Sequence, residues 1–298
     1  MGHTWWELEV VVPEMVAEDA AAQLFDAGAL GVEIACNGEG ETIARASFGE
    51  KPDPRAVKTA LLAMSINVDV AQMRIAKRDD EAWADKWKEH FEPFALGEVL
   101  WVVPSFRPDF RPPTNAIALH LDPGMAFGTG QHATTALCAQ WLEQRMASVP
   151  DQSKHSVLDV GCGSGILSIA AAKLGAGEVV GIDNDPDAVI VAVENVVANG
   201  VADTVRVTVD PAAEVEGPFD TVVANILADT LIALSADLIR LTTATGRLAL
   251  SGVLTNQAEE VVTAHLDSAK RLGRSNWRLL EQRTQGEWVA LIFGASMS

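Results

Sequence analysis

A glycine-rich turn between a buried strand and a helix is the strongest chemical signal in the sequence. The segment Val157–Leu167 reads VLDVGCGSGIL, with glycines at 161, 163 and 165. Glycine lets the backbone approach a ligand closely, and the helix start behind it offers free N–H groups and a positive dipole end. The pattern predicts a nucleotide-like ligand. Because the third glycine of a dinucleotide fingerprint would fall at Ile166, the spacing disfavours a pyrophosphate cofactor.

An acidic residue closes the strand that follows the glycine loop. Asp183 comes directly after the apolar run Val179–Ile182 and stands 22 residues beyond Gly161. A carboxylate at this place accepts hydrogen bonds from ribose hydroxyls in Rossmann folds. We therefore predict that Asp183 binds a ribose, whereas Asp185, which precedes Pro186, is predicted to cap the next helix.

Strands and helices alternate from about residue 115 onward. This alternation predicts an α/β fold with a mostly parallel, doubly wound sheet of the Rossmann-like kind. The strands are expected at 156–160, 178–182, 205–209, 221–224 and 247–251, and the helices at 166–174, 186–199, 228–241 and 256–270. Two final strands, at 277–282 and 288–293, are joined by a turn and predict an antiparallel last strand.

The first part of the chain has a different order of elements, β-α-β-β-α-β, which predicts a small ferredoxin-like α+β domain. Its strands are expected at 5–12, 31–36, 42–48 and 68–76, and its helices at 16–27 and 54–64. It carries no catalytic constellation, so we interpret it as a substrate-recognition domain. Trp83, Trp87 and Phe91 share one face of a predicted linker helix. The predicted domains are 1–78, a linker at 79–98, and 99–298.

The composition is that of a folded protein with an acidic surface. The chain has 298 residues, 48% of them hydrophobic, and 22 basic against 41 acidic residues give a formal charge of −19. Such a charge disfavours binding to a nucleic-acid backbone and attracts basic partners, unless it serves solubility alone. Three cysteines at wide spacing match neither disulfides nor a metal site, and no export signal or membrane span is apparent. We expect a cytoplasmic protein without a metal.

Two further segments narrow the interpretation. The sequence LDPGMAFGTGQHATT stands at 121–135, and VANIL at 223–227. The Asp-x-Gly-x-Gly-x-Gly motif with an acid after the next strand resembles class I S-adenosylmethionine-dependent methyltransferases. With the two added segments, the chain resembles the ribosomal protein L-eleven methyltransferase family. The resemblance extends over nearly the whole chain and includes LWVVPS at 100–105, SGVL at 251–254 and EWVA at 287–290.

The resemblance implies a cytoplasmic enzyme that uses S-adenosyl-L-methionine to trimethylate lysine side chains and an N-terminal amine of ribosomal protein L-eleven. The small domain would hold that substrate. We expect a monomer that binds neither nucleic acid nor membrane. The cofactor contacts implied by the family's motifs fall on Phe127, Thr129, Thr135, Gly161, Gly163, Asp183 and Asn225. The chain departs from the family at Gln131 and Ala133, where Thr and Pro are common.

Asn225 is the candidate catalytic residue. It follows the fourth predicted strand, at the carboxyl edge where α/β folds bind ligands. We predict that its side-chain oxygen accepts hydrogen bonds from the substrate amine and aims the nitrogen lone pair. The alternative is that Asn225 caps the next helix. His132 is a weaker candidate for a base, because a lone loop histidine is more often structural.

Three other functions fit parts of the pattern. The same cofactor fold could methylate a lysine of another protein or a small molecule, although the N-terminal domain favours a macromolecular substrate. A non-catalytic adaptor could keep the fold only to bind the ribosomal protein. An NAD-dependent reductase is disfavoured by Ile166 in the glycine loop.

Overall fold

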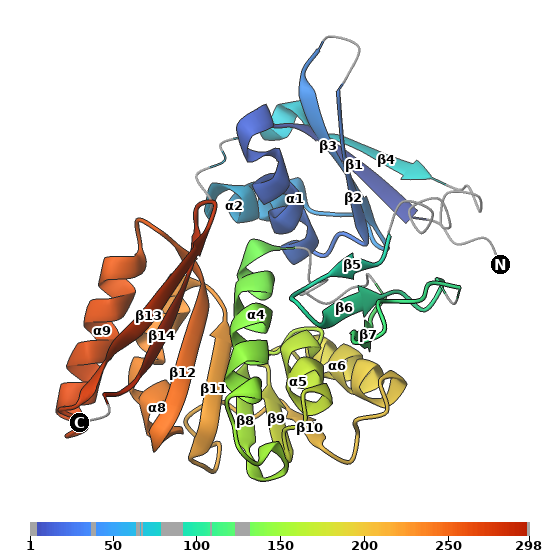
Figure 1. Ribbon diagram of the computed structural model, residues 1–298. Coiled ribbons are helices and arrows are strands. Elements are labelled where there is room, and N and C mark those ends of the chain that lie inside the picture. The colour runs from blue at the N-terminus through green and yellow to red at the C-terminus, as the bar shows by residue number, and fades with distance from the viewer. Residues whose placement is uncertain are drawn as a thin grey trace. The chain divides into compact units, whose positions relative to one another are not determined.

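The chain divides into two compact units, which Figure 1 shows in ribbon form. One unit comprises residues 1–92 and 122–127, and the other residues 93–121 and 128–298. The computed structural model describes residues 5–36, 40–63, 66, 68–78, 92–107, 109–122 and 132–296. Most of the predicted linker helix, and the aromatic residues at 83, 87 and 91, lie outside these residues. The predicted domain boundaries therefore stay predictions.

The first unit is a four-stranded antiparallel sheet with two helices. Its elements are β1 (Trp5–Val11), α1 (Ala17–Asp26), β2 (Gly31–Cys36), β3 (Thr42–Phe48), α2 (Pro54–Ala63) and β4 (Arg74–Arg78). The strand order is β2-β3-β1-β4, and every pair is antiparallel. Leu8 of the sheet and Leu24 and Leu61 of the helices are fully buried in its core. The predicted ferredoxin-like arrangement is confirmed.

One predicted strand of this unit is shorter than expected. The run 68–76 begins with a 3-10 turn at Val70–Gln72, and β4 starts only at Arg74. Asp69 fixes that turn, because its side chain accepts a hydrogen bond of 2.9 Å from the Ala71 N–H. A side chain that satisfies a nearby backbone donor competes with strand pairing.

The second unit is built on a seven-stranded sheet in the order β10-β9-β8-β11-β12-β14-β13. The strands are β8 (Ser156–Val160), β9 (Glu178–Ile182), β10 (Val205–Thr208), β11 (Phe219–Asn225), β12 (Thr242–Leu254), β13 (Trp277–Gln285) and β14 (Trp288–Ala295). β8 to β12 run parallel, whereas β14 is antiparallel to both β12 and β13. This is the predicted Rossmann-like sheet with an antiparallel end.

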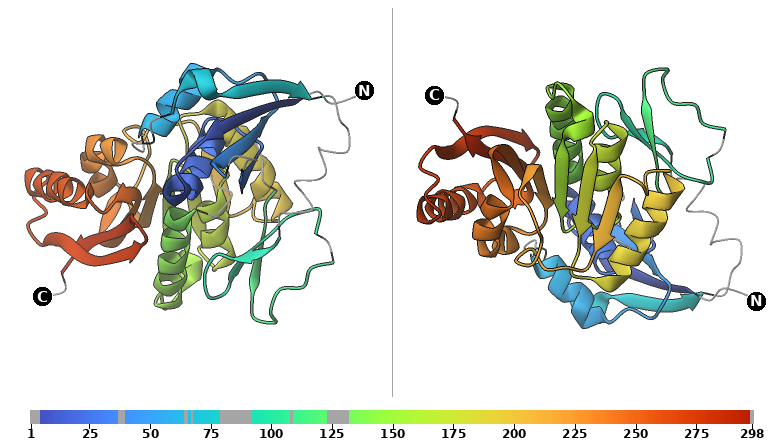
Figure 2. Two further views of the ribbon diagram at one scale, coloured as in Figure 1. Left: turned by 90° about the horizontal axis from the view of Figure 1, so that it is seen from above. Right: turned by 90° about the horizontal axis from the view of Figure 1, so that it is seen from below.

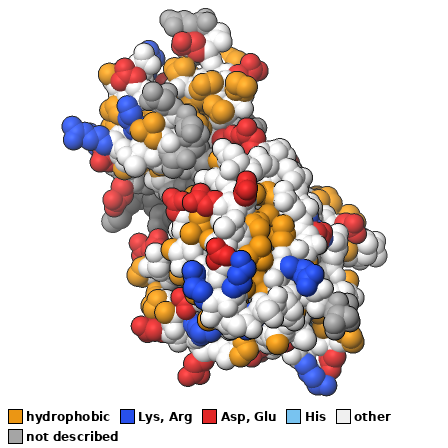
Figure 3. Space-filling model, turned by 90° about the vertical axis from the view of Figure 1, so that its left-hand side faces the viewer, with side chains coloured by type: hydrophobic (Ala, Val, Ile, Leu, Met, Phe, Trp, Pro, Cys, Tyr) orange, Lys and Arg blue, Asp and Glu red, His pale blue; other side chains and the backbone are white. Residues whose placement is uncertain are grey.

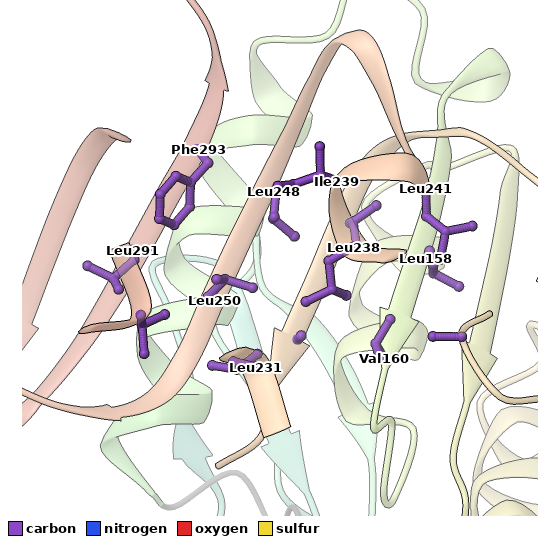
Figure 4. Packing of buried hydrophobic residues seen from close by; sticks show 14 of the residues in the cluster. Leu158, Val160, Leu231, Leu238, Ile239, Leu241, Leu248, Leu250, Leu291 and Phe293 are labelled. Atoms are coloured by element: carbon purple, nitrogen blue, oxygen red, sulfur yellow. The ribbon is translucent and has the colours of Figure 1, made fainter. Parts of the chain in front are cut away.

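Helices cover both faces of this sheet, as the view from below in Figure 2 shows. They are α4 (Ala133–Ala147), α5 (Ile166–Lys173), α6 (Pro186–Ala198), α7 (Ala228–Ala233), α8 (Ser235–Arg240) and α9 (Ala258–Arg271). One core lies between the sheet and α7 to α9. There Leu248, Leu250 and Phe293 of the strands meet Leu231 and Leu238 of the helices, all fully buried (Figure 4).

Two parts of this unit differ from the prediction. The single helix expected at 228–241 is interrupted at Leu234, which ends α7 and precedes α8 with φ −85° and ψ 1°. Leucine gives no sequence signal for such a break, because it favours helices. The prediction also lacked α4 and a small sheet of β5 (Phe94–Ala95), β6 (Leu100–Val103) and β7 (Ile117–His120).

A buried carboxylate fastens this small sheet to α4. Glu143 is 7% exposed and accepts backbone hydrogen bonds of 2.7–2.9 Å from three consecutive N–H groups, those of Glu98, Val99 and Leu100. Glu98 and Val99 stand in the turn before β6, and Leu100 is the first residue of that strand. Glu143 thus holds the start of the second unit against the helix whose other end carries Thr135.

Candidate active site

The glycine loop is tied to the end of the neighbouring strand. Gly161, Gly163 and Gly165 have positive φ angles of 72°, 52° and 78°, which favour glycine. The N–H groups of Gly161 and Cys162 donate to the Ile182 carbonyl at 2.8 and 3.0 Å. These two amides therefore bind the neighbouring strand and are not available to a ligand. The loop instead offers a ligand close backbone approach.

Asp183 receives the next amide of the loop. Its Oδ2 accepts a hydrogen bond of 2.9 Å from the Gly163 N–H, and its Oδ1 accepts one of 3.0 Å from the Asp185 N–H. The side chain is half-buried. Asp185 caps α6 by accepting from the Asp187 N–H at 2.9 Å, with Pro186 in the first turn, so its predicted capping role is confirmed.

Asp159 is a site residue that the sequence analysis did not single out. It ends β8 beneath the loop, is 1% exposed, and accepts hydrogen bonds from the Ser168 N–H at 3.0 Å and hydroxyl at 2.7 Å. Helix α5 begins after Gly165, which has no side chain to cap it, so Asp159 supplies an acceptor to its first turn. Burial raises the pKa of Asp159 to about 7, and the charge of Asp183 adds to this. The sequence signal that could have identified Asp159 was its position as the first residue of the Asp-x-Gly-x-Gly-x-Gly motif.

Two of the predicted site residues, Thr135 of α4 and Asn225 of β11, are brought together. The Asn225 Nδ2 donates to the Thr135 Oγ1 at 3.2 Å. Its Oδ1 is buried and has no hydrogen-bond partner among the described residues. Helix α7 starts at Ala228 with Leu227 before it and no side-chain cap, so the alternative of a capping role for Asn225 is wrong.

Ser251 presents a second unpartnered oxygen beside Asn225. The two residues are register partners on the parallel strands β11 and β12, so their side chains lie on the same face, toward α4. The Ser251 Oγ is buried without a hydrogen-bond partner in the described part of the chain. The Cys138 thiol of α4 lies beside this hydroxyl, and burial raises the pKa of the thiol to about 12. In the sequence, Ser251 stood out only as part of the SGVL segment at 251–254.

Ile226 is held between two glycines, and this fixes the position of Asn225. A Cβ on Gly161 would run into the Ile226 side chain, and a Cβ on Gly252 would run into the Ile226 carbonyl oxygen. Gly252 has φ +82°, so its conformation also favours glycine. The residue after Asn225 therefore contacts both the glycine loop and the bend in β12.

His132 has a structural place at the start of α4. Its Nδ1 lies 2.7 Å from the Thr134 Oγ1, and its ring meets the Trp288 ring edge-on at 4.6 Å. Burial lowers its pKa to about 4. A neutral histidine that caps a helix agrees with the interpretation of His132 as structural and not as a catalytic base. Phe127, Thr129 and Gln131, the other predicted or divergent positions of this segment, lie outside the described residues.

A family model described as "Ribosomal protein L11 methyltransferase (PrmA)" matches residues 4–295. The chain belongs to this family. The methyltransferase family predicted from the glycine loop, Asp183 and the two added segments is thus confirmed. So are the predicted enzyme class and its cofactor, S-adenosylmethionine.

Named relatives agree with this membership. The chain is 41% identical over 251 residues to a ribosomal protein L11 methyltransferase of Vibrio vulnificus, covering 83% of this chain and 82% of that protein. It is 43% identical over 247 residues to that of Cupriavidus necator, covering 83% and 76%. The crystal structure of a ribosomal protein L11 methylase from Lactobacillus delbrueckii is similar with a TM-score of 0.61 and 31% identity, over 70% of this chain and all of that one.

The geometry fits the cofactor of this family. The glycines leave room for a ligand against the backbone, Asp183 offers carboxylate oxygens at the end of β9, and Asn225 offers an unpartnered acceptor nearby in the sheet. All three stand at the carboxyl edge of parallel strands, where such sheets bind ligands.

Among the described residues, no helix is both long and apolar enough to cross a membrane.

Proposed function

We propose that this methyltransferase modifies amines of ribosomal protein L11, namely lysine side chains and the N-terminal amine, with up to three methyl groups each. The observation that carries the proposal is the buried, unpartnered Asn225 Oδ1 next to the glycine loop. A buried amide oxygen without a partner is costly, and an amine N–H is a suitable donor for it.

The residues proposed to hold the cofactor are Thr135, Gly161, Gly163, Asp183 and Asn225, with Phe127 and Thr129 over its methionine end. When bound, S-adenosylmethionine supplies a methyl group on a positively charged sulfur. Asp183 is proposed to accept from the ribose hydroxyls while it keeps the Gly163 N–H at 2.9 Å. Thr135 keeps the Asn225 amide oriented, because it accepts from Nδ2 and thereby leaves Oδ1 to face the substrate.

The chemistry requires alignment more than it requires a base. A lysine amine with pKa about 10.4 must lose its proton before it attacks, which costs about 4 kcal/mol near pH 7.4. Alignment of two bound reactants supplies about 7–11 kcal/mol. His132 is tied to Thr134 and is not needed as a base. The Asn225 Oδ1, assisted by the Ser251 Oγ on the same face, is proposed to accept the amine hydrogens and aim the lone pair.

The surface charge suits this substrate. The chain carries a formal charge of −19, and ribosomal proteins are typically basic, so their encounter is favoured by electrostatic steering. We further propose that the enzyme acts in the cytoplasm as a monomer, without direct binding to nucleic acid.

The test combines the purified protein, S-adenosylmethionine and unmethylated ribosomal protein L11, and records the intact mass of the substrate. We expect successive methyl increments that Asp183→Ala abolishes. Asp185→Ala is the matched control, because Asp185 caps α6 and is not proposed to touch the cofactor. Asn225→Ala should lower turnover far more than cofactor affinity, measured by calorimetry.

The rival functions predict other results. Binding of L11 and cofactor with no mass increment would favour the adaptor. Increments on other lysine-bearing proteins but not on L11 would reassign the substrate. Unchanged turnover in Asn225→Ala would remove its catalytic role and leave the methyltransferase assignment intact.

A further inference from the structure

A row of arginines crosses the sheet on the side of α4, away from the glycine loop. Thr221 of β11 pairs with Arg247 of β12, which pairs with Gly294 of β14, which pairs with Arg278 of β13. Directly paired residues of neighbouring strands project from the same face. Helix α4 adds Arg145, whose Nε donates to the Thr221 Oγ1 at 3.3 Å.

Gly294 makes room for this row. A Cβ at Gly294 would lie 2.9 Å from the Arg247 Nη1, so the Arg247 side chain lies across the glycine. Arg247 Nη1 donates to the carbonyls of Thr245 and Gly246 at 3.0 and 2.8 Å. These bonds hold the guanidinium in place and leave its remaining N–H groups available.

None of the three arginines, Arg145, Arg247 and Arg278, forms an ion pair with any described residue. This is unusual in a chain with 41 acidic and 22 basic residues. Arg283 on the same strand as Arg278 is paired, with its Nε 2.7 Å from the Glu281 carboxylate. The row is therefore a local excess of positive charge on an acidic protein.

The surroundings make that charge costly to leave uncompensated. Arg145 is half-buried, and burial together with the charge of Arg247 lowers its pKa; Asp220 opposes this. The Asp220 Oδ2 is already bound by the Ser156 N–H and hydroxyl at 3.1 Å each. His155 shares a 2.9 Å hydrogen bond with Thr221. Burial lowers the pKa of His155, so its ring adds no charge beside the arginines. Two like charges close together in a half-buried place are stabilised by an anion between them.

We propose that Arg145, Arg247 and Arg278 form a binding site for a tetrahedral oxyanion, specifically a phosphate group. Guanidinium N–H groups match phosphate oxygens in geometry as well as charge. Figure 3 looks at the molecule from the side where β13, β14 and α9 lie in Figure 1, and shows Lys and Arg side chains near a strip of hydrophobic ones, with Asp and Glu side chains among them.

The ligand is a small anion and not a nucleic acid. A polyanion that reached this row would extend over the rest of a surface whose formal charge is −19. Glu281 stands on the same strand as Arg278 and would repel a second phosphate of a chain. One phosphate group meets the row without this repulsion.

The experiment measures phosphate binding to the full-length protein by calorimetry, with sodium chloride at equal ionic strength as the reference. We expect saturable binding that weakens about tenfold or more in Arg145→Gln and in Arg247→Gln. Arg278→Gln is the variant least able to disturb folding, because Arg278 is exposed and has no hydrogen-bond or ion-pair partner to lose among the described residues. Arg283→Gln is the matched control and should bind as the wild type does.

A second arm titrates a labelled oligouridylate and follows its fluorescence anisotropy. No saturable phosphate binding, or equal binding in wild type and all the arginine variants, would overturn the proposal. Tight RNA binding that these variants abolish, without binding of free phosphate, would replace the small anion by RNA. Methyl transfer in Arg278→Gln should match wild type, which separates this site from the proposed reaction.

Discussion

The two ends of the seven-stranded sheet carry unsatisfied groups of opposite character. At the carboxyl edge of β11 and β12, the Asn225 Oδ1 and Ser251 Oγ are buried oxygens without a described partner. On the same face but at the other end of these strands, Arg145 and Arg247 are cations without an ion pair in the described chain. An acceptor-rich end suits an amine, and a donor-rich end suits an anion. One sheet face thus offers two sites whose ligands do not compete.

The largest expected effect comes from adding a side chain at the carboxyl edge of the sheet. Gly252→Ala puts a side chain against the Ile226 carbonyl at a φ of +82°, where alanine costs about 1–2 kcal/mol in addition. Ile226 must shift, and Asn225 with it, so we expect methyl transfer to fall about a hundredfold. Steady-state kinetics on L11 would measure this.

The control for this change is Gly273→Ala. Gly273 also has a positive φ, +74°, but a Cβ there meets nothing within 4 Å. It should lose a similar increment of melting temperature and keep its turnover. Equal turnover losses in the two variants would show that backbone strain, and not the contact with Ile226, is responsible.

The carboxyl edge could be predicted from sequence because parallel strands collect their following residues at one end. This rule predicts that Gly161, Asp183 and Asn225, which stand where three parallel strands end, lie at one edge of the sheet. The arginine row could not be predicted in this way. It depends on the pairing of β14 between β12 and β13, and on Gly294 lying beside Arg247, which only the register reveals.

Other features were missed because hydrophobic periodicity does not show them. The turn fixed by Asp69 results from a side-chain hydrogen bond that hydrophobic periodicity does not record, and the break at Leu234 has no sequence signal, because leucine favours helices. The role of Asp159 was visible in its motif position, but its burial was not. The small sheet of β5 to β7 depends on Glu143, which stands 43 residues from its partner Leu100.

The second prediction concerns the pH dependence of stability and tests how deeply Asp159 is buried. Its pKa of about 7 in the folded protein lies above its ordinary value of 3.8, so between these pH values the folded state holds a proton that the unfolded state has released. The contribution of Asp159 to the free energy of unfolding should therefore fall as pH rises through this window, by at most about 1.4 kcal/mol per unit, and level off above 7. Urea unfolding at several pH values would measure it.

Asp159→Asn removes this titration and serves as the reference. The difference in unfolding free energy between wild type and variant isolates Asp159, because His132 and His265, whose pKa values burial lowers to about 4, titrate in both proteins. A difference that stays constant from pH 4 to 7, or grows with pH, would mean that the carboxyl is ionised in the folded protein.

The smallest effect compares one hydroxyl at each end of the sheet. Ser251→Ala removes a buried hydroxyl that has no described partner, so the free energy of unfolding should rise by about 1 kcal/mol while turnover falls, because the group is kept for the substrate. Thr221→Val removes a hydroxyl that is bound to Arg145 and to His155, and should cost about 1–3 kcal/mol and leave turnover unchanged. Chemical unfolding and kinetics on both variants give the comparison. A loss of stability in Ser251→Ala would show that its hydroxyl is already satisfied within the protein, and the contrast between the two ends would then rest on Asn225 alone.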